Sequence, residues 1–136
     1  MIINVLAHFW HVLCLFWFML MRKKAYAVGH AWLDAWNKAD MQGYEALYAE
    51  NATEVSTLAH RLQLGNARIK GKKNLLPYWS HLRSKLKNPQ FTFDEIHIFK
   101  GHVLLHFQIE ALKSKAIARM ELNDEYKIGH IQIAHI

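Results

Sequence analysis

Glu54 and His135 are the two candidate side chains for proton transfer in an apolar setting. His135 follows Ile131 and Ile133 at alternate positions of a β-rich segment, so it is expected on their inward face. A neutral histidine there can act as a general base or acid near neutral pH. The other interpretation is a histidine that satisfies a backbone carbonyl at the chain end, and the sequence leaves both open.

Glu54 belongs to a short segment, 53–58, whose β-branched residues and alternation predict a strand. If that strand begins directly after Asn51, Glu54 points inward with Ser56. A carboxyl group inside an apolar pocket has a raised pKa, which suits proton transfer. A shift of one residue reverses every side chain, and Val55 then points inward while Glu54 faces solvent.

Metal and cysteine chemistry have little support in the sequence. Cys14 is the only cysteine, which excludes an intrachain disulfide and a cysteine-based zinc site. Histidines recur on the predicted neighbouring strands, but no HxH or HExxH spacing with a carboxylate partner accompanies them. We therefore expect no metal and no cofactor. The histidines concerned are His97, His102, His106, His130 and His135.

The elements that must position these groups follow from hydrophobic periodicity. Helices are predicted over 24–38, 41–49 and from Asn74 to Asn88-Pro89, and Asp40 is a suitable N-cap for the second. Strands are predicted over 53–58, 91–99, 102–111, 116–122 and 127–136, and 59–70 is expected to be a hairpin arm or loop. Antiparallel strands joined by short turns, with helices on one face, indicate an α+β fold with a curved sheet.

Several sequence segments resemble the SnoaL-like group of the nuclear-transport-factor-2-like superfamily, most closely its small ketosteroid-isomerase-related proteins. These segments are AWLDAWNKAD, ALYAEN, IKGKKNLLPYW, NPQFTFDEI and the C-terminal AIARMELND-EYKI-GHIQIAH. The resemblance implies a cystatin-like cone, in which a strongly curved antiparallel sheet wraps around three N-terminal and central helices. It also implies an apolar small-molecule pocket and a homodimer through the convex sheet face. It suggests one extra residue near Ala52, which slightly favours Val55 inward.

The resemblance also locates the catalytic positions of true ketosteroid isomerases. A tyrosine and two acids of those enzymes correspond here to Trp32, Ser56 and Ala118, none of which can take their roles. Pocket-lining residues are expected from the helices and the inward strand faces. They are Trp32, Trp36, Tyr44, Tyr48, Ser56, Tyr78, Trp79, Ala118, Met120, Ile131 and Ile133.

Two functions remain open on this evidence. The first is cofactor-free acid–base catalysis of the isomerase, cyclase or dehydratase type, with His135 and Glu54 as proton carriers. The second is a non-catalytic binding or dimerisation module, which uses the same cavity to hold an apolar ligand or the convex sheet face to hold a partner. The formal net charge of +6 brings no nucleic-acid motif with it, so no specific nucleic-acid partner is expected.

Residues 1–21 form an apolar segment ahead of the predicted domain, 22–136. About twenty apolar residues can span a bilayer as a helix. The basic triplet 22–24 would then keep the domain on the cytoplasmic side. An over-long reading frame that should start at Met21 explains the segment equally well, and a helix packed on the domain or a partner is a third option.

Overall fold

The computed structural model describes residues 2–58 and 68–136. Its helices are α1 (Ile2–Asn37), α2 (Met41–Ala46), α4 (Lys72–Lys85) and the 3-10 turn η1 (Glu110–Leu112). Its strands are β1 (Tyr48–Ser56), β2 (Arg68–Lys70), β3 (Phe91–Phe99), β4 (His102–Ile109), β5 (Ser114–Leu122) and β6 (Ile128–His135). Most of the predicted hairpin arm 59–70 lies outside the described residues.

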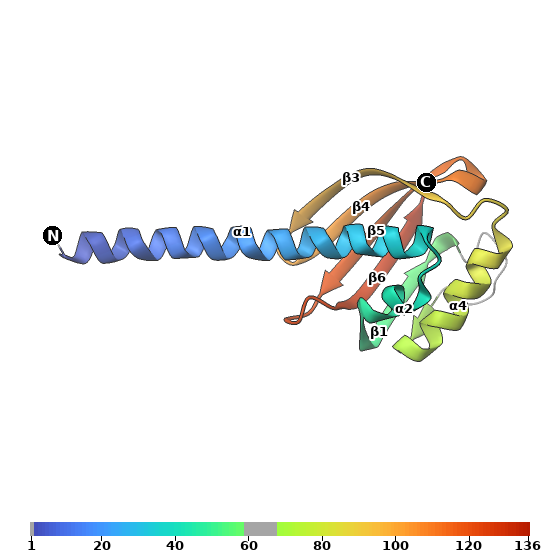
Figure 1. Ribbon diagram of the computed structural model, residues 1–136, viewed down its shortest axis with the longest axis horizontal. Helices are drawn as coiled ribbons and strands as arrows, with labels where there is room; N and C mark the ends of the chain where they lie inside the picture. Colours follow the sequence, from blue (N-terminus) through green and yellow to red (C-terminus); the bar gives the residue numbers. More distant parts are fainter. Residues whose placement is uncertain (1, 59–67) are drawn as a thin grey trace.

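The six strands form one curved sheet in the order β2-β1-β6-β5-β4-β3 (Figure 1). Neighbours pair antiparallel, as predicted, except that β1 runs parallel to β6. The sheet is therefore mixed, and the α+β prediction is confirmed. Strand β3 has the predicted bounds, whereas β1 starts five residues earlier than expected and ends two residues sooner.

The C-terminal half of α1 packs across the sheet and supplies much of the core. Trp32 and Trp36 are fully buried, with Val28 and Ala35 on the same helical face. Gly29 allows the close approach, because a Cβ there would lie 2.5 Å from Cδ1 of Ile96 on β3. The predicted apolar face of the first helix is thus the face that meets the sheet.

The N-terminal half of α1 leaves the domain entirely and extends far beyond the sheet (Figure 1). The predicted apolar segment and the first domain helix form one continuous helix. The exposed large apolar side chains include Trp10, Phe16 and Trp17, and the first buried residue is Ala25. Residues 3–37 contain a stretch that is long and apolar enough to cross a membrane, and none of that stretch is buried.

Asn37 fastens the end of α1 to the start of the edge strand β3. Its Nδ2 donates to the carbonyl of Phe91 at 2.8 Å, and its Oδ1 accepts from the Phe91 N–H at 2.8 Å. Asn37 therefore occupies the hydrogen-bonding edge of β3 as a neighbouring strand residue would. Arg83 Nε donates to the Trp36 carbonyl at 3.2 Å and satisfies part of the helix C-terminus.

We expect Asn37→Ala to lower the free energy of unfolding by about 1–3 kcal/mol, because it leaves two backbone groups of the buried Phe91 without partners. Urea unfolding in mild detergent measures the change. Asn51→Ala is the matched control, since Asn51 is exposed and should give a change within about 0.5 kcal/mol. Equal effects of the two substitutions would contradict the proposed fastening.

Candidate functional site

Strand β1 turns Ala52, Glu54 and Ser56 toward the interior, where each is no more than 1% exposed. Val55 lies on the outer side and is only partly buried. The slight preference for Val55 inward is therefore wrong, and the other register holds. The reason is local: the β1–β6 pairing shifts between Tyr48 and Thr53, so the irregularity is complete before Glu54.

Among residues 2–58 and 68–136, buried polar atoms without well-formed hydrogen bonds gather around Glu54. Both carboxyl oxygens of Glu54 are of this kind, as are the hydroxyls of Ser56 and Tyr78 and the indole N–H of Trp79. The first two residues lie on β1 and the other two on α4, which packs against β1. Native interiors leave few such groups unpaired, so this cluster marks a place where water or a ligand belongs.

A chain of hydrogen bonds borders the cluster. The Trp32 indole N–H donates to the Tyr48 hydroxyl at 2.9 Å, and that hydroxyl donates to the Tyr44 hydroxyl at 2.8 Å. All three side chains are buried. In this direction the Tyr44 hydroxyl is the last member of the hydrogen-bond series, and its O–H can donate to a further acceptor.

Burial governs the protonation of these groups. It raises the pKa of Glu54 well above its usual value, and the nearby Trp79 indole N–H opposes the rise only in part. Burial also raises the pKa values of Tyr44, Tyr48 and Tyr78, and the charge of Glu54 raises each of them further.

The other predicted pocket residues lie mostly on the same inner surface. Trp79 contacts Trp32 and Tyr44 with ring centroids 6.0 and 5.4 Å apart. Trp36 stacks on Phe91 and donates its indole N–H to the Pro89 carbonyl, which fits core packing. The inward residues of β5 and β6 are all buried, and their contact with a ligand stays a prediction. They are Ala118, Met120, Ile131 and Ile133.

His135 lies apart from Glu54. It is half-buried at the end of β6, and its backbone N–H donates to the Thr57 hydroxyl at 3.0 Å. Glu54 pairs with Ile131, four residues before His135, which separates the two Cα atoms by about 13 Å along the strand. The two predicted proton carriers therefore do not form a dyad, and a catalytic role for His135 stays a prediction.

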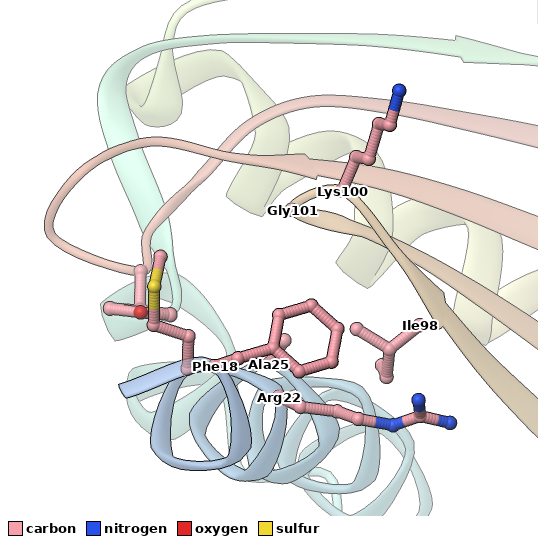
Figure 2. A pocket seen from close by; sticks show the side chains of 8 residues that line it. Phe18, Arg22, Ala25, Ile98, Lys100 and Gly101 are labelled. Atoms are coloured by element: carbon pink, nitrogen blue, oxygen red, sulfur yellow. The ribbon is translucent and has the colours of Figure 1, made fainter. Parts of the chain in front are cut away.

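Separate hollows lie where α1 leaves the domain. In one of about 230 Å³, Phe18 and Arg22 of α1 face Ile98 of β3 (Figure 2). A neighbouring one of about 580 Å³ lies between α1 and the turns after β3 and β5, with Lys24 and Tyr126 in its wall. Both are bounded by the exposed apolar part of the helix and contain none of the predicted catalytic residues.

The arrangement around Glu54 can donate or accept one proton in an apolar, aromatic surrounding. A neutral carboxylic acid kept protonated near pH 7 can donate a hydrogen bond to a ligand oxygen, and its ionised form can remove a proton. The Tyr44 hydroxyl supplies a second donor. Such a set suits proton transfer next to a carbonyl group and requires no metal.

Comparisons with known proteins agree with this architecture. The sequence model of the SnoaL-like domain family matches residues 30–131. No curated protein matches the chain in sequence.

Several solved structures share the fold. A SnoaL-like protein of unknown function from Burkholderia thailandensis has a TM-score of 0.75 and 17% identity, over 84% of this chain and 95% of that one. A candidate SnoaL-like isomerase from Agrobacterium tumefaciens has a TM-score of 0.68 and 15% identity, over 84% of this chain and 98% of that one. A candidate polyketide cyclase from Sinorhizobium meliloti has a TM-score of 0.67 and 13% identity, over 79% of this chain and 94% of that one. At these identities the similarity establishes the nuclear-transport-factor-2-like cone alone.

The raised pKa of Glu54 makes stability depend on pH. The folded chain holds its proton more tightly than the unfolded chain, whose glutamate has its usual value of 4.5. The stabilisation that comes from this tighter proton binding is fully present below pH 4.5, the pKa of the unfolded chain's glutamate. As pH rises toward the folded pKa, the free energy of unfolding should therefore fall by up to about 1.4 kcal/mol per pH unit.

We expect Glu54→Gln to remove this slope, because glutamine has no proton to lose. Denaturant unfolding between pH 5 and pH 8 in mild detergent measures it, with the slope estimated from about four pH values. The matched control is Glu50→Gln on the same strand, since the Glu50 side chain is 92% exposed and should leave the slope intact. Identical slopes in wild type and Glu54→Gln would contradict a raised pKa.

Proposed function

Because the chain belongs to the SnoaL-like domain family, we propose that its domain binds a small, largely apolar molecule beside Glu54 and moves a proton on it. The proposed reaction is cofactor-free acid–base catalysis of the isomerase, cyclase or dehydratase type. The observation that carries the proposal is the buried Glu54 carboxyl group, for which the described residues 2–58 and 68–136 supply no cation and, as a nearby donor, the Trp79 indole N–H.

The neighbouring groups support a ligand with one polar end. Within the part of the chain that the structure describes, the Ser56 and Tyr78 hydroxyls and the Trp79 N–H form no well-aligned hydrogen bond, so a ligand oxygen has several donors to choose from. The remaining wall is aromatic, from Trp32 and Tyr44. A mostly apolar body with a carbonyl or hydroxyl matches this combination, because apolar surfaces bind and a few polar groups orient.

Glu54 is the proposed proton carrier. Tyr44 is the proposed hydrogen-bond donor to the ligand's carbonyl oxygen. Removing a proton next to a carbonyl develops negative charge on its oxygen, which a buried hydroxyl stabilises better than water does. Glu54 then returns the proton to another atom of the ligand. A pKa raised by burial brings the carboxyl group nearer to the working pH, where it can perform both steps.

A panel of cyclic ketones of one to three rings tests this function without knowledge of the natural substrate. Exchange of the protons next to the carbonyl with D2O is followed by NMR, with the full chain in mild detergent. We expect exchange above the buffer rate for at least one ketone, and a loss of about 10²–10⁴-fold in Glu54→Gln.

Glu50→Gln again serves as the control and should exchange at the wild-type rate, since its side chain is exposed. If Glu54→Gln still binds the active ketone, the loss of exchange rate lies in the proton-transfer step and not in binding. If wild type binds ketones but never exceeds the buffer rate, catalysis is contradicted. The non-catalytic alternative, a ligand-binding or dimerisation module with the convex sheet face as its contact, then stands.

A second proposal concerns location, and the exposed N-terminal half of α1 supports it. Residues 2–21 give a helical length of about 30 Å, which matches the hydrocarbon thickness of a bilayer. Large apolar side chains such as Phe9, Trp10 and Phe18 are each at least 60% exposed, which is costly in water. We propose that this segment anchors the chain in a membrane, with the basic triplet 22–24 and the domain on the cytoplasmic side.

Replacing Leu13 and Phe16 together by lysine should release the chain from membranes. Two lysines near the bilayer centre cost about 2.5–3.5 kcal/mol each. Both residues are exposed, so the domain should stay folded. The measurement is the share of chain that stays with the membrane fraction after a high-salt wash.

The matched control adds two lysines to the exposed domain surface, as Asn51→Lys with Ser84→Lys, and should remain in the membrane fraction. Wild-type chain recovered in the soluble fraction would contradict anchoring. It would favour a helix that packs on the domain or on a partner.

A further inference from the structure

Glu95, His97 and His106 form a cluster on the outer face of the sheet, on the side opposite Glu54. Their ligand atoms all lie within 4.8 Å of one another. The His97 Nε2 is 3.3 Å from a carboxyl oxygen of Glu95, and the His97 and His106 ring centroids are 5.7 Å apart. This cluster belongs to neither proposed function.

Strand pairing holds the three side chains together. Glu95 and His97 are alternate residues of β3, so they project from the same face. Glu95 is directly opposite His106 on β4, and His97 is diagonal to it across the strand pair. The backbone hydrogen bonds of the sheet thus fix all three Cα positions, and only side-chain rotations remain free.

The donor set matches a borderline divalent cation. Two imidazole nitrogens and one carboxylate oxygen are typical protein ligands of zinc when a water completes the tetrahedron. Tetrahedral zinc needs ligand atoms about 3.3 Å apart, so the present atoms must close by no more than about 1.5 Å. Glu95 and His97 are more than half exposed, which leaves the side chains free to rotate and an ion free to enter.

The surrounding charges permit such an ion. Two outward cations of β5 lie two residues either side of Ile117, which is opposite His106: the exposed Lys115 is opposite Gln108 of β4, and Arg119 is opposite Leu104. Its guanidinium group donates to the Gln132 side chain on β6 and pairs with Glu121, so it is directed away from β3.

We propose that Glu95, His97 and His106 of one chain form a surface site for Zn²⁺, which joins the edge strand β3 to β4. No ion is needed for the fold, because β3 is already paired with β4 along its length. The ion would stabilise the folded chain by binding it in preference to the unfolded chain. The site is independent of Glu54, since the sheet separates the two.

Zinc titration of the chelator-treated, untagged full chain in mild detergent tests the site, with calorimetry as the readout. We expect one ion per chain and a loss of affinity of at least about tenfold in His97→Ala, His106→Ala and Glu95→Gln. Cobalt provides a second readout, because its visible absorption reports tetrahedral coordination and should disappear in the same variants.

His102→Ala and His130→Ala are the matched controls. Both histidines belong to the same sheet but lie outside the cluster, and His130 is engaged by Thr53 at 2.6 Å. Unchanged zinc affinity in His97→Ala or His106→Ala overturns the proposal, as does the absence of binding by wild type. One ion per two chains also overturns it, because two copies would then supply the ligands.

Discussion

The desolvation of one carboxyl group is the constraint on which the interior of this domain depends. Alternation along β1 turns Glu54 inward between Ala52 and Ser56, and no cation pairs with it among residues 2–58 and 68–136. Because an isolated buried charge is costly, burial raises the pKa of Glu54 and favours its protonated form. The interior thereby acquires a titratable group whose state a ligand can change.

The aromatic side chains around Glu54 increase its desolvation. Trp32, Tyr48 and Tyr44 satisfy one another through hydrogen bonds, so they enclose the region without bringing water to it. Trp79 of α4 packs against Trp32 and Tyr44 and, with Tyr78, brings to the same region polar atoms that lack well-formed hydrogen bonds within residues 2–58 and 68–136. The hydrogen bonds among Trp32, Tyr48 and Tyr44 hold these aromatic side chains in place. The polar atoms of Tyr78 and Trp79 are the ones that a ligand can engage.

The sequence was most informative where periodicity is long and regular. The apolar face of α1 with Trp32 and Trp36, the Asp40 cap and the full extent of β3 were all predictable from spacing and capping chemistry. The register at Glu54 was not, because an irregularity lies just before it and a slip of one residue reverses every side chain. Local pattern cannot fix that choice; pairing with β6 does.

Contacts between distant segments were also beyond the sequence. The Asn37 link to Phe91 joins residues 54 positions apart, and the outer cluster depends on β3 pairing with β4 in one register. Inspection of histidine spacing alone missed that cluster, because its third member is Glu95 and its geometry is cross-strand. An acid and a histidine at alternate strand positions were the available signal.

The two-residue period of the sheet gives this small domain two separate chemical surfaces. Inward positions such as Glu54 and Ser56 have little access to water, so their chemistry depends on what enters the interior. Outward positions such as Glu95 and His97 are solvated and adjustable, so their chemistry depends on which ions are present. Because substitution on one face leaves the other face's side chains in place, the proposed acid–base function and the proposed metal binding can be tested independently.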